Sequence, residues 1–205
     1  MRRLLLAAAL AGAAAGGFLF WRRNPSACPY GHRWMIELPK PGVSVTRMLE
    51  VLDPQAKERL LEIGPGTGQF TLPVAQRLEG GRLEVFDLQQ EFLDLVAERA
   101  AKNGVKNIVG WQGDARELLF EANRFDGAFL VTVLGEIPDQ DAALRELARV
   151  VKPGGRVVFG EVVLDPHVVT LSDLIRRAER AGLKFDRKAG TPLGYVARFT
   201  VPAAA

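Results

Sequence analysis

A glycine-dense turn follows a short apolar run in the first half of the sequence. Residues 61–68 read LEIGPGTG, with glycine at positions 64, 66 and 68. Glycine adopts positive φ angles readily and lets the backbone approach a ligand closely. A strand that runs into such a turn and then into a helix places the turn at the carboxyl edge of a parallel sheet, where ligands bind. The GxGxG spacing differs from the GxGxxG of dinucleotide sites, and an acid, Glu62, ends the strand.

Short apolar runs alternate with helical patterns along the rest of the chain. Runs that are apolar throughout, such as residues 128–133, are typical of strands covered on both faces. The alternation predicts an α/β fold with a Rossmann-like, doubly wound sheet, and two final strands without a helix between them predict one antiparallel strand. We predict a mostly parallel seven-stranded sheet, with strands at 59–63, 82–87, 107–111, 125–133, 156–163, 183–187 and 194–201 and helices at 69–78, 91–103, 115–121, 140–150 and 172–181.

The N-terminal segment has a different composition. Residues 4–21 carry no charge, and pairs of arginines stand on either side, at positions 2–3 and 22–23. As a helix these residues would span ~27 Å, close to the thickness of a bilayer core. We predict an N-terminal apolar membrane-anchor helix over residues 1–23, a linker or lid over 24–44 and one domain over 45–205. A cleaved signal peptide and a soluble apolar tail are the alternatives.

Charge and residue counts exclude several classes of site. The net charge of +3 comes from the N-terminal 40 residues, which hold six basic residues and one acid, so the domain itself has no basic surface typical of nucleic-acid binding. Cys28 is the only cysteine, which excludes an internal disulfide framework. With only two histidines as well, we expect no metal site.

Two further acids fall where a nucleoside would need them. Asp87 ends the strand after the glycine turn, about 20 residues beyond Gly64, and a carboxylate there can accept hydrogen bonds from both ribose hydroxyls. Asp114, in the sequence QGDA, follows the third strand and can accept a hydrogen bond from an adenine amino group. The sequence KPGG at residues 152–155 predicts a turn before the fifth strand.

These motifs together resemble the class I S-adenosylmethionine-dependent methyltransferases, over about residues 45–200. LEIGPGTG is similar to the glycine motif of that family, VFDLQQEFL to its acidic loop and QGDA to its adenine-contacting motif. FDGAFLVTVLGEIPD and ALRELARVVKPGG resemble the stretch shared with ubiquinone/menaquinone-type methyltransferases and related small-molecule enzymes. The resemblance implies S-adenosyl-L-methionine as cofactor and a small-molecule acceptor.

The resemblance also implies which residues bind the cofactor. The glycines and Thr67 would line its methionine and ribose end, the pair after the second strand its ribose, the pair after the third strand its adenine, and Thr132 the pocket floor. Glu62 would either join the site directly or hydrogen-bond the glycine loop. The predicted cofactor-binding residues are Glu62, Gly64, Gly66, Thr67, Gly68, Asp87, Leu88, Asp114, Ala115 and Thr132.

Methyl transfer needs a base only if the acceptor must lose a proton. The residues predicted to face the same sheet edge, and hence the candidates, are Glu136, Asp139, Glu161 and His167. Three residues of the linker, Tyr30, His32 and Trp34, either close over the site, with an aromatic ring facing the sulfonium, or pack the linker onto the domain.

We therefore predict a methyltransferase whose acceptor is a small molecule, and the apolar tail suggests a lipid or a quinone-type compound. A cytosolic cofactor places the catalytic domain on the cytoplasmic side of a membrane, anchored by residues 1–23. Two alternatives are a nicotinamide-dependent oxidoreductase of Rossmann type and a non-catalytic cofactor-binding domain. No nucleic-acid partner is expected, and the sequence predicts no oligomeric state.

Overall fold

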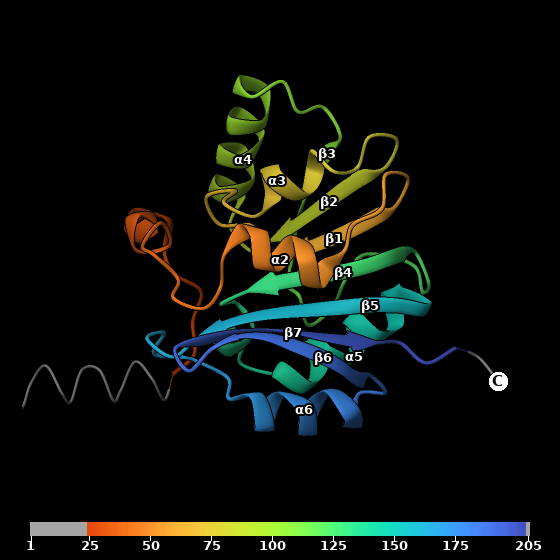
Figure 1. Cartoon of the computed structure of the whole chain (residues 1–205). Coiled ribbons are helices and arrows are strands. Elements are labelled where there is room, and N and C mark those ends of the chain that lie inside the picture. Colours follow the sequence, from red (N-terminus) through yellow and green to blue (C-terminus); the bar gives the residue numbers. More distant parts are fainter. Residues whose placement is uncertain (1–23, 204–205) are drawn as a thin grey trace, which may run out of the picture.

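A computed structural model describes residues 24–203, which form an α/β fold (Figure 1). In chain order the elements are η1 (Tyr30–Met35), α2 (Val45–Leu52), β1 (Arg59–Ile63), α3 (Thr71–Ala75), β2 (Arg82–Asp87), α4 (Gln90–Lys102), β3 (Ile108–Gln112), β4 (Phe125–Val131), η2 (Leu134–Glu136), α5 (Gln140–Val150), β5 (Val151–Val162), α6 (Leu171–Arg180), β6 (Lys184–Thr191) and β7 (Gly194–Thr200). All seven predicted strands are present, with small shifts in their ends.

The strands form one sheet in the order β3-β2-β1-β4-β5-β7-β6. Strand β7 runs antiparallel to both of its neighbours, and the other pairs are parallel. This confirms the predicted mostly parallel sheet with one antiparallel strand. The strand order reverses between β1 and β4, so the helices that follow these two strands, α3 and α5, cover opposite faces of the sheet, and ligands bind at the carboxyl edge at such a point.

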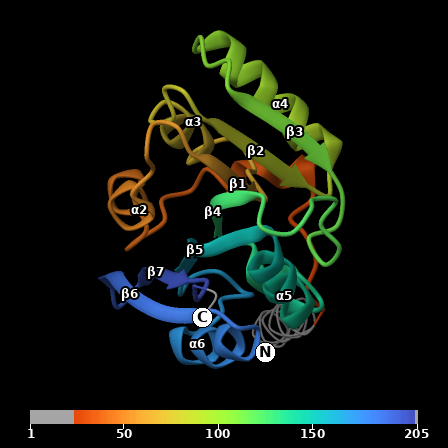
Figure 2. The same ribbon diagram turned by 90° about the vertical axis from the view of Figure 1, so that its right-hand side faces the viewer.

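Helices cover both faces of the sheet (Figure 2), and an apolar core lies between the sheet and each helical layer. Phe129 of β4 faces the core beneath α2, α3 and α4, whereas its neighbours Ala128 and Leu130 face the core beneath α5 and α6. Successive side chains of a strand point to opposite faces, so a strand between two helical layers is apolar at most positions. This is why the central strands were recognisable as continuous apolar runs.

The helix predicted over residues 115–121 does not form. The backbone N–H of Leu118 donates to Glu146 Oε2 at 2.8 Å. Arg149 donates to the carbonyls of Phe120, at 2.7 Å, and of Leu118, at 3.0 Å. Side chains of α5 thus satisfy the backbone groups that a helix would bond internally, and these partners are remote in sequence.

Residues 152–155, predicted as a turn before the fifth strand, instead form a bulge inside β5. Val151 already pairs with Phe125 of β4. The register then shifts, and Arg156 pairs with Gly127. Gly154 has a φ of +80° and its N–H donates to the carbonyl of Val201 at 2.8 Å. Strand β5 therefore begins at Val151, before the proline and glycines, and not at residue 156 as predicted.

Two helices on the first face also differ from expectation. The short α2 was not predicted; Ser44 caps it by accepting from the N–H of Arg47 at 3.2 Å. Helix α3 is shorter than predicted because Asn107 Nδ2 donates to the carbonyls of Ala75, at 2.9 Å, and Leu78, at 2.8 Å. A side chain from the segment before β3 thus closes the C-terminal end of α3.

The predicted membrane-anchor helix over residues 1–23 lies outside the described residues. Within residues 24–203, no helix combines the length and the apolar character that crossing a bilayer requires.

Arg156 of β5 ties together three elements at the amino edge of the sheet. Its guanidinium forms a two-pronged ion pair with Glu58, at 2.7 and 2.6 Å, just before β1. It also donates to the carbonyl of Leu52 at the end of α2 and, at 3.0 Å, to that of Asp53. The Arg156 side chain is only 8% exposed and that of Glu58 17%, so the ion pair is largely screened from water.

We predict that Arg156→Ala lowers the free energy of unfolding by about 3–5 kcal/mol, because it removes the two-pronged ion pair, so that Glu58 keeps only the N–H of Gln55, and it removes the donor to the carbonyls of Leu52 and Asp53. Urea denaturation followed by circular dichroism measures this loss. Arg176→Ala is the matched control, since the Arg176–Asp173 pair is half exposed on α6 and should contribute less than about 1 kcal/mol. Equal losses in the two variants would contradict the role given to Arg156.

Candidate functional site

The glycine turn after β1 has a backbone that requires glycine at two or more positions. Gly64, Gly66 and Gly68 have φ angles of +65°, +52° and +83°. A Cβ atom on Gly64 would lie 2.5 Å from Cγ2 of Val133, in the loop after β4. The N–H of Gly64 donates to the carbonyl of Phe86 at 2.8 Å, which holds the turn against β2. The turn therefore lies at the reversal of strand order, with its backbone open to the carboxyl edge.

Buried polar atoms lie together behind this turn. Glu62 Oε2, Thr67 Oγ1 and Thr71 Oγ1 are buried without a well-formed hydrogen bond among the described residues, although the Thr71 hydroxyl lies close enough to the Glu62 carboxyl to interact with it. Burial raises the pKa of Glu62 to about 8. Buried polar groups without well-formed hydrogen bonds lower the stability of the folded protein. Three such groups lie together behind the glycine turn.

Asp87 ends β2 beside the turn. Its Oδ1 accepts the N–H of Gln89 at 2.8 Å, and burial raises the pKa of the carboxyl to about 6. Leu88 follows with 56% of its surface exposed. A carboxylate fixed through one oxygen in this way keeps the other oxygen for a ligand hydroxyl.

Asp114 follows β3 and already has a partner. The guanidinium of Arg116 donates to both of its oxygens, at 2.6 to 3.0 Å, and the Arg116 N–H donates to Oδ1 at 2.9 Å. These hydrogen bonds lower the pKa of Asp114. An adenine amino group would share this carboxylate with Arg116, a residue that no motif in the sequence singled out.

These residues surround a cavity of about 320 Å³ at the carboxyl edge, which is near the lower end of the range for small-molecule sites. It combines apolar walls with the carboxylates of β2 and β3. The lining residues are Pro25, Ser26, Ala27, Ile63, Gly64, Phe86, Asp87, Leu88, Gly113, Asp114, Ala115, Arg116, Val133, Glu136, Ile137 and Pro138.

A second, smaller cavity of about 70 Å³ continues past the glycine turn. Gly66 and Thr132 line it, and a Cβ on Gly66 would project toward Ile36, 3.1 Å away. Thr132 has a φ of +55°, which is strained for a β-branched residue. Its N–H donates to the carbonyl of Gly160 at 2.8 Å, so the sheet itself holds this conformation.

A third cavity, of about 200 Å³, lies on the far side of Thr132. Most of its wall is apolar, and it shares the polar groups of Thr132 and Glu136 with the second cavity. The lining residues are Cys28, Met35, Ile36, Leu38, Pro39, Lys40, Thr132, Glu136, Val162, Leu164, Asp165, Pro166 and His167. The three cavities thus form a series along the carboxyl edge.

Glu136 lines all three cavities. It ends η2, and its Oε2 accepts the N–H of Cys28 at 3.2 Å. Burial raises the pKa of Glu136 to about 8, and the carboxyls of Asp165 and Asp87 add to the shift. A proton-accepting group therefore stands where the cavities meet.

The other three candidate bases are placed differently. Asp139 accepts the N–H of Ala142 at 2.9 Å as the N-cap of α5 and lines none of the three cavities. Glu161 is 2% exposed inside β5, accepts the N–H of Val169 at 3.3 Å and also stays behind the cavity walls. His167 lines the third cavity, and its N–H donates to Asp165 Oδ1 at 2.7 Å.

The predicted cofactor-binding residues form two groups, those that line a cavity and those that do not. Seven of them line the first or second cavity: Gly64, Gly66, Asp87, Leu88, Asp114, Ala115 and Thr132. Glu62, Thr67 and Gly68 lie behind the turn and line neither cavity. Among residues 24–203, no group of His, Cys, Asp and Glu is arranged to hold a metal ion.

The segment before α2 lies over the series of cavities. Gln89 links it to β2, because its Oε1 accepts the N–H of Tyr30 at 3.0 Å and its Nε2 donates to the carbonyl of Cys28 at 2.9 Å. The ring of Tyr30 packs edge-on against Phe92, with 5.2 Å between centroids. Tyr30, His32 and Trp34 line none of the three cavities. Residues such as Cys28 and Ile36 cover the site instead.

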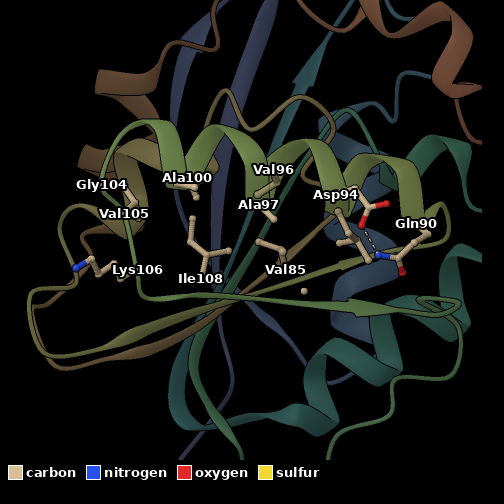
Figure 3. A pocket seen from close by; sticks show the side chains of 13 residues that line it. Val85, Gln90, Asp94, Val96, Ala97, Ala100, Gly104, Val105, Lys106 and Ile108 are labelled. Atoms are coloured by element: carbon tan, nitrogen blue, oxygen red, sulfur yellow. Dashed lines mark hydrogen bonds between the residues drawn. The ribbon is translucent and has the colours of Figure 1, made fainter.

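A larger groove of about 570 Å³ lies elsewhere, between α4 and the edge of the sheet (Figure 3). Aliphatic side chains such as Val96 and Ile108 line it, and at one end Gln90 Nε2 donates to Asp94 Oδ1 at 2.8 Å. No residue of the glycine turn and no candidate base lines this groove. Its size therefore does not make it the functional site.

A family model described as a methyltransferase domain matches residues 60–155, which include the glycine turn and the KPGG bulge. The chain is 33% identical over 114 residues to the ubiquinone/menaquinone biosynthesis C-methyltransferase UbiE of Vibrio cholerae, a match that covers 53% of this chain and 44% of the relative. It is 32% identical over 150 residues to the 2-phytyl-1,4-naphtoquinone methyltransferase of Synechococcus elongatus, covering 72% and 57%. The chain thus spans about half the length of these relatives.

Solved structures share the fold at low sequence identity. A SAM-dependent methyltransferase from Aquifex aeolicus superposes with a TM-score of 0.71 at 19% identity, covering 85% of this chain and all of that one (100%). The [4+2]-cyclase SpnF superposes with a TM-score of 0.70 at 20% identity, covering 78% and 80%.

We predict that Glu62→Gln stabilises the ligand-free protein increasingly as pH rises from about 4.5 to about 8. The folded-state pKa of Glu62, about 8, lies above its ordinary value of 4.5. Within this window the native state binds more protons than the unfolded state, so the wild type loses stability with rising pH. The amide has no proton to lose and is spared this loss.

Thermal unfolding of both proteins at pH 5, 6.5 and 8 measures the effect. Glu50→Gln, on the exposed side of α2, is the control for removing a carboxyl. A difference in Tm between Glu62→Gln and the wild type that stays constant with pH would contradict the buried state of Glu62.

Proposed function

We propose that this chain, which belongs to the class I S-adenosylmethionine-dependent methyltransferases, transfers a methyl group from S-adenosyl-L-methionine to a small-molecule acceptor. The observation that carries the proposal is the series of three cavities that meet at Glu136. A donor on one side of Thr132 and an acceptor on the other would meet at this junction. Holding two reactants in line can lower the barrier by ~7–11 kcal/mol.

The first two cavities fit the cofactor. Asp87 offers a free carboxylate oxygen to the ribose hydroxyls, and Asp114 with Ala115 bounds the adenine end. The open backbone at Gly66 leaves room that any side chain would fill. Glu62 and Thr67 supply buried polar atoms without well-formed hydrogen bonds close behind the methionine end. When bound, the cofactor supplies a methyl group on a positively charged sulfur.

In the proposed reaction the acceptor atom forms a bond to the methyl carbon while the carbon–sulfur bond breaks and its electron pair stays on sulfur. The acceptor loses one proton in the process, and we assign this proton to Glu136. The Cys28 N–H holds one oxygen of that carboxyl, which leaves the other to face the junction. His167 and Lys40 line the acceptor cavity and can orient its polar group.

We further propose a quinone-type acceptor, a ring with an ionisable oxygen or carbon and an apolar substituent. Two observations support this choice. The acceptor cavity has mostly apolar walls, and it shares the polar groups of Thr132 and Glu136 with the second cavity. The two relatives described above act, by their names, in ubiquinone and menaquinone biosynthesis and on a naphthoquinone.

We propose that the enzyme works at a membrane, with residues 1–23 as an anchor and the domain on the cytoplasmic side. The support is the sequence of residues 4–21, which has no charge and stands between arginine pairs. An acceptor with a long apolar substituent would be found there.

Two other functions are less well supported. A nicotinamide-dependent oxidoreductase would share the sheet, but the family model and the quinone methyltransferase relatives favour methyl transfer. A non-catalytic cofactor-binding domain would keep the first two cavities and make no use of the third. Formation of a methylated product would distinguish an enzyme from such a binding domain.

We predict that Asp87→Asn weakens S-adenosylmethionine binding by about 10–100-fold, since hydrogen bonds to charged groups contribute ~1.5–3 kcal/mol. The pKa of Asp87 is about 6, so wild-type affinity should rise as pH increases through 6 and the carboxyl ionises. The variant should lack this rise. Isothermal titration at pH 5 to 8 measures both effects, with Asp94→Asn in the outer groove as the control. Failure of the wild type to bind would overturn the proposal.

We predict that Glu136→Gln reduces the rate of methyl transfer by about 10²–10⁴-fold, the usual contribution of a general base. The wild-type rate should increase with pH up to about 8, where Glu136 becomes ionised. The assay incubates the full-length protein with labelled S-adenosylmethionine and a membrane lipid extract, and mass spectrometry identifies the product. Asp139→Gln, at the α5 cap, controls for the loss of a nearby acid. An unchanged rate in Glu136→Gln would remove Glu136 from the mechanism.

A further inference from the structure

Exposed apolar side chains gather around the mouth of the acceptor cavity. Among residues 24–203, nine large apolar side chains are exposed. Six of them belong to three segments around this mouth: Trp34, Met35, Leu38, Val163, Leu164 and Leu193. We call these six residues the apolar rim. Soluble surfaces rarely collect so many large apolar groups in one place without a partner.

Contacts between the three segments establish that the rim is continuous. Met35, Leu38 and Leu164 line the same cavity. The N–H of Val163 donates to the carbonyl of Leu193 at 2.9 Å, which joins the loop after β5 to the turn between β6 and β7. In Figure 1, η1, the loop after β5 and this turn all lie at the edge of the sheet on the left.

The chain enters the described structure at the same edge. Pro25, Ser26 and Ala27 line the first cavity, so residue 24 lies beside the series of cavities. The sequence before it has no charge from residue 4 to residue 21. A bilayer reached by that apolar segment would therefore face the edge that carries the rim.

Charges near the rim are compatible with a membrane surface. Arg33 is exposed next to Trp34, with its guanidinium 4.6 Å from the centroid of the Tyr30 ring. Glu37, the acid of this segment, is paired with Arg99 at 2.8 Å. A basic group beside exposed tryptophan and leucine is the composition that favours the interface of an anionic bilayer.

We propose that the apolar rim docks on the surface of a lipid bilayer, so that the acceptor cavity opens toward the membrane and takes its substrate from there. This inference rests on the proposed function and adds the route of the acceptor to it. The occupant of the rim is the interfacial region of the bilayer. A long apolar substituent would stay in the bilayer while the reactive ring enters a cavity of about 200 Å³.

Fluorescence quenching by brominated lipids tests the docking, because the chain has three tryptophans and two of them serve as probe and control. Trp34 lies in the rim, whereas Trp111 is exposed on β3, which β2, β1 and β4 separate from β5, β7 and β6 in the order of the sheet. The full-length Trp21→Phe/Trp111→Phe variant keeps Trp34 alone, and Trp21→Phe/Trp34→Phe keeps Trp111 alone. Each is mixed with vesicles of phosphatidylcholine and phosphatidylglycerol, with and without brominated acyl chains, and flotation measures binding.

We expect both variants to float with the vesicles and the brominated chains to quench most of the Trp34 fluorescence and little of that of Trp111. Adding Val163→Asp and Leu193→Asp, which do not line the cavities, should weaken the quenching of Trp34 and leave S-adenosylmethionine binding unchanged. No flotation, equal quenching of the two tryptophans, or Trp34 shielded in a vesicle-free dimer would overturn the proposal.

The outcome is separable from that of the proposed function. Quenching of Trp34 without S-adenosylmethionine binding would support the docking surface and contradict the proposed methyltransferase function. Methylation of a detergent-dispersed lipid extract without quenching of Trp34 would support the proposed methyltransferase function and contradict the docking surface.

Discussion

The close approach of the glycine turn to the loop after β4 is the constraint on which the site depends. Gly64 lies so near Val133 that a Cβ atom would be 2.5 Å from its side chain. This contact brings together the ends of β1 and β4, where the strand order reverses. Thr132 is held beside it in a left-handed conformation by its hydrogen bond to Gly160. The three cavities therefore meet at Glu136 because the two central strands end side by side.

The sequence was sufficient for the sheet and for the positions of the residues that line the first two cavities, because both are encoded locally. Strands buried on two faces are mostly apolar, and Gly64 to Asp114 fall at fixed places after successive strands. Residues 115–121 were misassigned because their backbone partners, Glu146 and Arg149, belong to a helix far along the chain. The acceptor side was not predictable for the same reason, since it joins Cys28, Glu136 and His167 from three distant segments.

The fold alone does not decide the chemistry. A [4+2]-cyclase and a SAM-dependent methyltransferase superpose on this chain with nearly equal TM-scores. What differs among proteins of one fold is the set of groups at the site. Here those groups are the acid at Asp87, the acid at Glu136 and the mostly apolar cavity beyond them, and all three are consistent with the proposed methyl transfer to a compound of low polarity.

The acids around the junction act on one another. Glu136, Asp165 and Asp87 each have a raised pKa, mainly through burial, and the carboxyls of Asp165 and Asp87 also contribute to the shift of Glu136. A fully ionised cluster would bind a positively charged sulfur strongly, yet it would also oppose the loss of that charge as the methyl group leaves. Raised pKa values limit this cost, because part of the cluster stays protonated at neutral pH. In the proposed reaction, the burial that raises the pKa of Glu136 to about 8 thus makes its ionised form a stronger base and also limits the negative charge that would hold the donor in its charged state.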